Sequence, residues 1–304
     1  LRSGTIDMIS EYGLTFDQAL AFESKIAAEK LPYRMVYQSA FSFEHAIFNL
    51  DNPILASVNV RRALIYGLDR QAMVKALFKG KQQVADYDVN PKDIWYTQDP
   101  KFVTLYPFNK AKAIELLTKD GWTPGPDGVR VKNGQRLSIV FMSTAGNKMR
   151  ENVQTFIQEQ WKALGVETVI KNEPPRVFFA ETTQKRKFQG LAMFAMVANP
   201  ERIPFGRNHS ASIPTEANGF SGQNYAGWKN KRVDEILSNT LLEFSAPKRS
   251  QSMREYAKEY TSDVPHIPLY FRSDNLVVPL NLKNYKPTGH VYPPTNSIET
   301  WTLE

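Results

Sequence analysis

Cysteine is absent from the 304 residues of this chain, which excludes disulfide bonds, thiolate nucleophiles and cysteine-based metal sites. Long apolar runs are absent too: the longest covers residues 191–197, whereas a membrane-spanning helix needs about 20 such residues. The sequence contains no serine-hydrolase elbow, zincin motif, P-loop or Gly-x-Gly-x-x-Gly. The four histidines are too widely spaced for a local metal-ligand pattern: His45, His209, His266 and His290. We therefore expect a globular protein that is not an enzyme and that has no cofactor and no metal.

The charge is moderately basic, because 38 Lys and Arg against 31 Asp and Glu give a net charge of +7. A nucleic-acid-binding protein would gather such charge into a stripe. Here the basic clusters are short and scattered, at residues 79–81, 185–187 and 229–232, and acidic residues lie between them. We expect an ordinary solvated surface and no nucleic-acid partner.

Segments with helical and with strand periodicity alternate, which predicts an α/β fold with a mixed sheet flanked by helices. The clearest unit is a strand at 137–142, a helix that ends at Gly165, and a strand at 166–171. Such a β-α-β crossover places its two strands in parallel. Further strands are expected at residues 43–49, 191–197 and 267–271, and further helices begin near Ser57, Asp69, Asn109 and Ser245 or run through Val233.

The polar segment at 198–225 has no predicted regular structure and follows a buried strand. Structureless segments beyond about 12–15 residues are uncommon unless they are functional, and ligands usually bind at the carboxyl ends of strands in α/β sheets. We therefore predict the ligand site here. Glu201 either receives a ligand ammonium group or forms a surface ion pair with Arg202 or Arg207.

A second loop, at 143–147, leads directly into the crossover helix. Two interpretations remain open for it. Its backbone amides bind an anion at the helix start, or the loop is simply a capped helix N-terminus.

Residues 60–70 read VRRALIYGLDR, and residues 49–55 in front of them read NLDNPIL. Together they resemble the signature helix of bacterial extracellular solute-binding proteins of the peptide, opine and nickel class, family 5. Further blocks follow in the family's order, at residues 106–107, 111–117, 120–122, 127–129, 222–230, 233–237 and 265–270. The order holds along nearly the whole chain, so the sequence is identified as a member of this family.

The resemblance implies a periplasmic-binding-protein-like (type II) lobe, one part of a bilobal protein that closes on its ligand. Family members are substantially longer, so we expect the C-terminal portion of a longer protein, with the front part and any signal peptide outside this sequence. Residues 1–40 would be part of the first lobe and residues 41–270 the second, ligand-binding lobe. Residues 271–304 would return to the first lobe.

The same resemblance implies a function in transport. The protein would be the substrate-binding subunit of an ABC importer, a monomer that captures an oligopeptide-like solute in the periplasm and delivers it to the permease transmembrane subunits. The family also carries opines, sugars and metal chelates, so a receptor of the same fold for a non-peptide solute is the alternative. With most of one lobe absent, we expect this chain alone to bind ligand weakly or not at all.

In family members, the strand that matches residues 191–197 and the loop after it line the ligand cleft. The position of Met196 commonly holds a tryptophan, and residues 198–201 commonly carry an aspartate that holds a peptide's amino terminus. This sequence departs at both points, and Glu201 is the candidate substitute for the aspartate. Residues 208–215 resemble a block that borders the cleft. The predicted ligand contacts are Met196, Asn199, Glu201, Arg202, His209, Ser210, Gln223 and Asn224.

Overall fold

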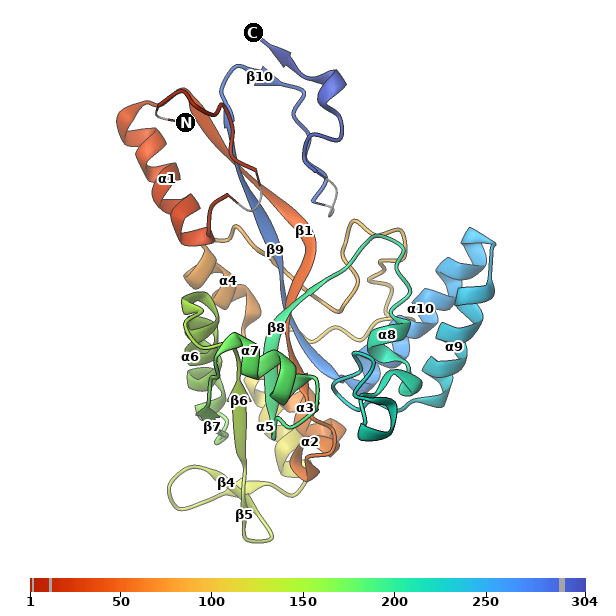
Figure 1. The fold of residues 1–304 in the computed structure, drawn as a ribbon. Coiled ribbons are helices and arrows are strands. Elements are labelled where there is room, and N and C mark those ends of the chain that lie inside the picture. The colour runs from red at the N-terminus through yellow and green to blue at the C-terminus, as the bar shows by residue number, and fades with distance from the viewer. Residues whose placement is uncertain (2, 11–12, 290–292) are drawn as a thin grey trace.

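Two long antiparallel strands run through the whole molecule in the computed structural model, which describes residues 1, 3–10, 13–289 and 293–304. They are β1 (Tyr33–Phe48) and β9 (His266–Pro279), which lie side by side along the long axis in Figure 1. The sequence predicted only the second half of β1 and the first half of β9. Those halves are buried, whereas the first half of β1 is only partly covered, so its apolar signal is weaker.

A six-stranded mixed sheet is built around this pair, in the order β2-β9-β1-β8-β6-β7. The added strands are β2 (Gln83–Val84), β6 (Ser138–Met142), β7 (Glu167–Ile170) and β8 (Leu191–Val197). β6 pairs in parallel with β7 and β8, and β1 pairs antiparallel with β8. Helix α6 (Lys148–Lys162) connects β6 to β7, so the predicted mixed sheet and its parallel crossover are confirmed.

One face of the sheet is covered by helices of the signature region (Figure 1). These are α2 (Pro53–Ala56), α3 (Val58–Tyr66), α4 (Arg70–Phe78) and α5 (Lys110–Lys119). Asp69 and Asn109 cap α4 and α5 as predicted, because each side chain accepts a hydrogen bond from a backbone amide of the first turn. Trp161 of α6 is fully buried among these helices and donates to the carbonyl of Leu64.

The arginines of the signature helix bind main-chain oxygens inside the protein. Arg61 donates to the carbonyls of Leu55, Ala56, Asp263 and Val264, at 2.6–3.0 Å. Arg70 donates to the carbonyls of Ala85, Tyr106 and Pro268. Because a buried charge is costly unless its donors are satisfied, this part of the motif acts by fixing helices and strand β9 to one another.

The other face of the sheet is covered by a second buried cluster, to which an antiparallel helix pair contributes. The pair is α9 (Lys231–Leu242) and α10 (Ala246–Asp263), and both helices project from one side of the molecule in Figure 1. A π-helical turn at Phe178–Thr183, entered from α7 (Pro175–Val177), adds Phe178 to this cluster. A small sheet of β3 (Thr123–Pro124), β4 (Arg130–Lys132) and β5 (Gln135–Arg136) lies at the end of the molecule below α5 in Figure 1.

The opposite end of the molecule has its own small hydrophobic cluster. Helix α1 (Phe16–Glu29) and the outer halves of β1 and β9 lie there with the C-terminal segment (Figure 1). The segment after β9 contains a two-stranded sheet of β10 (Leu282–Lys283) and β11 (Thr302–Leu303). The cluster contains Leu276, Val278, Leu282 and Tyr285, with Met8, Val36 and Trp301 packed against them. Among the described residues, no helix has both the length and the apolar character that crossing a membrane requires.

Close packing of β8 against β6 gives a stability prediction at Gly190. A Cβ atom built on Gly190 would lie 2.1 Å from the carbonyl oxygen of Val140, whereas one on Gly206 has no heavy atom within 4 Å. Gly190→Ala should therefore lower the free energy of unfolding by about 1–3 kcal/mol through overpacking, and Gly206→Ala should change it by less than about 0.5 kcal/mol. Urea unfolding followed by circular dichroism measures both; equal stability of the two variants would contradict the predicted contact.

Candidate functional site

A cleft of about 820 Å³ lies where the outer and inner halves of the long strands meet. Its walls come from distant parts of the chain: the start of α1, the middle of β1 and β9, the loop between β6 and α6, and the end of β8. Main contributors are Thr15, Phe41, Ser42, Thr144, Lys148, Arg150, Phe179, Val197, Ala198, Arg272 and Asp274. The cleft therefore has both apolar and charged walls, as expected for a site that accepts a polar organic ligand.

The floor of the cleft is a break in the β1–β9 ladder. Ser39 pairs with Ser273 and the next paired residue, Phe43, pairs with Phe271, so residues 40–42 stand opposite Arg272 alone. The extra residues interrupt the ladder and bend the strand. Their main chain finds other partners: the amide of Phe41 donates to Gly289, and its carbonyl accepts from Ala198.

The loop at 143–147 forms one wall of the cleft. Three of its amides have partners within the chain: Ser143 donates to the side chain of Asn172, Ala145 to the carbonyl of Glu173, and Gly146 to the carboxylate of Glu151. Asn147 accepts from the amide of Arg150 and so caps α6. Of the two open interpretations, the structure supports the capped helix start, because a ligand anion would have to displace the Glu151 carboxylate.

Three ionic side chains meet beside this wall. Glu44 of β1 is fully buried, and its Oε1 atom accepts from Arg150 Nε at 3.1 Å and from a terminal nitrogen of Arg272. The other arm of Arg150 donates to the Thr144 hydroxyl at 2.9 Å. Burial alone would lower the pKa of Arg272, but attraction to Glu44 and the hydrogen bond to it outweigh burial and raise this pKa.

Sequence reasoning missed this ionic cluster. Its members lie on β1, α6 and β9, and Arg150 and Arg272 are 106 and 228 residues from Glu44 along the chain. The one local signal is that Glu44 lies in the buried, largely apolar inner half of β1, which indicates a buried partner of opposite charge.

The end of β8 presents a different side chain to the cleft from the predicted one. Met196 packs in the buried cluster with Phe43 and Trp95, whereas Val197 is 56% exposed and lines the cleft. Successive side chains of a strand point to opposite faces, so the two residues cannot both face the ligand. Met196 therefore remains a prediction as a ligand contact, and Val197 takes the position beside the cleft.

The first residues after β8 surround a second, much smaller cavity of about 20 Å³. Asn199 and Arg202 line it together with Asp88 and Arg207. Glu201 is exposed, and its amide donates to Asp93 at 2.9 Å. The structure thus brings Asn199 and Arg202 together at this smaller cavity, and Ala198 lines both it and the larger cleft.

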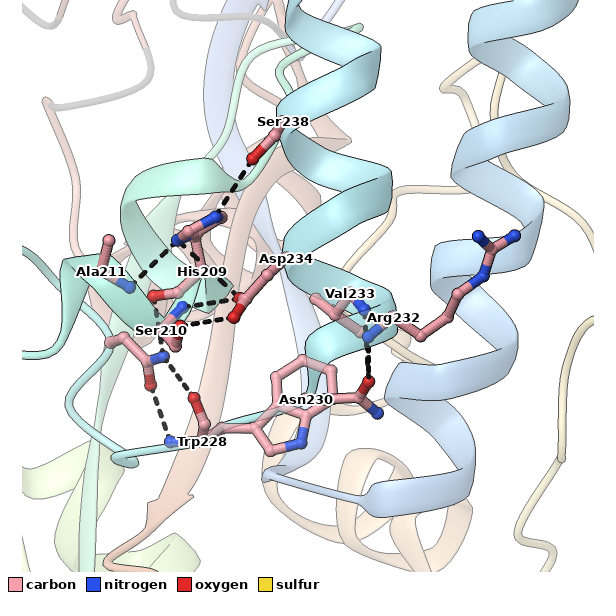
Figure 2. A network of polar contacts seen from close by, with 10 residues as sticks. His209, Ser210, Ala211, Trp228, Asn230, Arg232, Val233, Asp234 and Ser238 are labelled. Carbon is pink, nitrogen blue, oxygen red and sulfur yellow. Dashed lines mark hydrogen bonds and ion pairs between the residues drawn. The ribbon is translucent and has the colours of Figure 1, made fainter.

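Three of the remaining predicted contacts, His209, Ser210 and Asn224, belong to a polar network that attaches this segment to α9, and Figure 2 shows His209 and Ser210 with their partners. His209 Nε2 lies 3.2 Å from the Ser238 hydroxyl, and Ser210 binds the Asp234 carboxylate through its amide and its hydroxyl. The buried Asn224 side chain donates to the carbonyls of His209 and Trp228, at 3.1 and 2.8 Å. Gln223 is exposed, and its amide donates to Gly206.

The composition of segment 198–225 suggested that it has no regular structure, but the structure shows several short helical turns. The segment contains α8 (Phe205–Asn208) and 3₁₀ turns at Ser210–Ser212 and Glu216–Asn218. In the described part of the chain, none of the predicted ligand contacts lines the 820 Å³ cleft. Their role as ligand contacts stays a prediction, whereas their internal hydrogen bonds are structural.

A buried polar group links the segment to helix α10. Asp88 accepts from the Tyr256 hydroxyl at 2.6 Å and from the Asn208 amide at 3.2 Å. Burial raises the pKa of Asp88, although Arg207 nearby acts to lower it. His266, whose Nδ1 lies 3.1 Å from the Tyr260 hydroxyl, has its pKa lowered to about 3 by burial and by the charge of Arg207.

No set of three or more His, Cys, Asp or Glu side chains in the described ranges is arranged to hold a metal ion. His290, the fourth histidine of the sequence, lies outside the described residues.

The mixed sheet with flanking helices, together with its cleft at the crossing of two long strands, defines a type II periplasmic-binding-protein-like lobe. The protein-family model described as "Bacterial extracellular solute-binding proteins, family 5 Middle" matches residues 1–208. The chain belongs to this family, as its motifs indicated.

Known relatives cover the chain almost completely. The oligopeptide-binding protein AppA of Bacillus subtilis (strain 168) is 28% identical over 302 residues, which are 95% of this chain and 52% of the relative. The solved oligopeptide-binding protein of Thermus thermophilus, complexed with a pentapeptide, has a TM-score of 0.81 and 31% identity over 97% of this chain and 52% of its own. The structure of AppA with a nonapeptide has a TM-score of 0.78 at 24% identity, a likeness that shows the fold alone, and this chain covers 57% of it. The chain spans about half the length of these relatives.

Acidification should destabilise the chain through the buried His266. The unfolded pKa of His266 is about 6.5 and the folded pKa about 3, so the unfolded state binds more protons between these values. His266 thus contributes stability that is complete above pH 6.5 and is lost as the pH falls toward 3, at up to about 1.4 kcal/mol per pH unit.

Urea unfolding at about pH 7, 6 and 5 measures this slope in the wild type and in His266→Gln. The raised pKa of Asp88 acts with the opposite sign, and the lowered pKa of the buried His45 acts with the same sign. Both groups are present in the wild type and in the variant, so the difference between the two slopes reports on His266 and on its effect on the neighbouring His45. The variant should show the shallower dependence; identical slopes would contradict the neutral buried imidazole.

Proposed function

We propose that this chain forms the ligand-binding part of a substrate-binding subunit of an ABC importer. In this role it captures an oligopeptide-like solute outside the inner membrane, and lobe closure prepares delivery to the permease. The observation that carries the proposal is the cleft at the crossing of β1 and β9, whose walls come from both ends of the chain and from the six-stranded sheet. Relatives named as oligopeptide-binding proteins support the choice of ligand.

The division into lobes is part of the same proposal. Residues 41–270 are the second lobe, and residues 1–40 and 271–304 belong to the first. Support comes from the interrupted pairing at residues 40–42 and from the separate hydrophobic cluster around Leu276 and Val278. A ladder that lacks regular hydrogen bonds at this point can absorb the changes in backbone angle that a hinge requires.

An extended peptide suits the walls of this cleft. Phe179 and Val197, which are 42% and 56% exposed, offer apolar surface, while the half-buried Ser42 offers a hydroxyl. In such sites the peptide main chain supplies most hydrogen bonds, and water fills the space beside variable side chains. Binding without catalysis accords with relatives that are named as binding proteins.

The cellular setting is part of the proposal. The family is described as extracellular, which supports an exported protein that works in the periplasm. Its partners would be the peptide and the permease transmembrane subunits, with the binding protein itself a monomer. Mass spectrometry of small molecules that co-purify with the complete protein tests the ligand class: peptides support the proposal, and a sugar, opine or metal chelate in their place would establish the non-peptide alternative.

A blocked cleft is the direct test of the site. Ala145 is exposed on the cleft wall, and Ala211 is exposed on the segment that sequence reasoning favoured. Ala145→Trp should abolish oligopeptide binding by filling the cleft, and Ala211→Trp, the matched control, should leave it unchanged. Calorimetry with peptides of four to nine residues measures both; loss of binding only in Ala211→Trp would overturn the assignment.

The isolated chain should bind such peptides weakly, with dissociation constants above about 1 μM, because one lobe alone buries only part of the ligand. Submicromolar binding by the isolated chain would contradict the proposed division of the ligand surface between two lobes.

A further inference from the structure

The ionic cluster at the cleft carries more positive than negative charge. Two guanidinium groups, from Arg150 and Arg272, share a single carboxylate oxygen of Glu44. The second oxygen of Glu44 is buried and has no hydrogen-bond partner in the described structure. One carboxylate therefore balances two cations, and one positive charge is left over.

The exposure of the three side chains decides whether a ligand in the cleft contacts positive or negative charge. The Glu44 side chain is 0% exposed, that of Arg150 is 9% exposed and that of Arg272 is 36% exposed. Both arginines line the cleft, and Glu44 lies behind them. The surplus charge is thus presented to the cleft, where partial exclusion of water strengthens its attraction for an anion.

The other charged groups at the cleft leave room for this role. Lys148 adds a cation whose side chain is 76% exposed and whose Nζ lies 3.9 Å from the Glu151 carboxylate. Asp17 and Asp274 also line the cleft. Asp274 already interacts within the chain, whereas the exposed Asp17 suits a positive group on the ligand, so a ligand with charges of both signs can be held in one orientation.

We propose that Arg272 and Arg150 bind a carboxylate of the ligand, and that Glu44 is the positioning residue that holds both guanidinium groups toward the cleft. This inference rests on the proposed function and specifies its ligand class: peptides that bring a carboxylate to the crossing of β1 and β9. Guanidinium groups match carboxylates through paired hydrogen bonds, which gives direction as well as attraction. The carboxylate is either a peptide's C-terminal group or an acidic side chain.

A peptide series separates these two sources. The probes are a short neutral peptide with Gln at its centre, the same peptide with Glu, and both peptides with amidated C-termini. Nuclear magnetic resonance titration at millimolar concentrations follows the Nε–Hε signals of arginine together with backbone amides of residues 144–150. Such titration detects the weak binding expected of the isolated chain.

The expected result is that peptides with a bound carboxylate shift the Arg150 and Arg272 signals and bind about tenfold more tightly than peptides without it. If amidation removes this advantage, the bound carboxylate is the C-terminal group of the peptide. If replacing Glu by Gln removes it, the bound carboxylate is the acidic side chain. Equal binding of all four peptides would overturn the inference but leave the proposed function intact. No shift of cleft signals by any peptide would overturn both.

Variants test the roles of the individual residues. Arg272→Gln should abolish the preference for the carboxylate, and Arg272→Lys should restore part of it. Arg136→Gln is the matched control, because Arg136 also pairs with two carboxylates, Asp127 and Glu167, but lies on β5 far from the cleft (Figure 1). A preference that persists in Arg272→Gln, or that falls equally in Arg136→Gln, would contradict a direct contact.

Glu44→Gln tests positioning separately from binding. The neutral side chain keeps a hydrogen-bond acceptor for the guanidinium groups but loses the charge that fixes them. In this variant, peptides that offer the bound carboxylate should lose part of their advantage in affinity over peptides without it. Binding of the amidated Gln peptide, which carries no carboxylate, should stay unchanged. An equal loss of affinity for every peptide would mean that Glu44 serves only the fold.

Discussion

The antiparallel pairing of β1 with β9 is the constraint on which the rest of the structure depends. It joins Tyr33 to Pro279 at one end and Ile47 to His266 at the other, so it holds together the beginning and the end of the chain. The six-stranded sheet grows on the inner half of this pair, and α1 and the small C-terminal sheet lie by the outer half. The break at residues 40–42 then turns one continuous ladder into two connected parts with a cleft between them.

Much of the fold could be predicted because its signals are local. Asp69, Asn109 and Asn147 cap helices within three residues of themselves, and the apolar spacing of α6 lies within a single helix. The strand-helix-strand order of the crossover was therefore predicted correctly. The outer half of β1 was not, because a half-covered strand has a weak pattern, and its partner lies more than 200 residues away. The outer half of β9 is buried, but Ser273, Asp274 and Asn275 interrupt its apolar pattern.

The site was harder to predict for the same reason. The segment 198–225 attracted attention through its composition, but its Asn, Ser and His side chains are used to build turns and to bind α9. The cleft is assembled from single residues of many elements, such as Phe41, Arg150, Val197 and Arg272. No sequence motif joins them; family resemblance led to the end of β8, and only the strand's alternation selects Val197 over Met196.

Ligand recognition at the crossing is the central claim, and protection of backbone amides tests it most directly. Hydrogen exchange followed by mass spectrometry compares the protein with and without a saturating oligopeptide. The account predicts slower exchange in residues 40–42 and 144–150, with residues 205–225 unchanged. Slower exchange confined to residues 205–225 would contradict it and return the ligand to the segment that the sequence alone favoured.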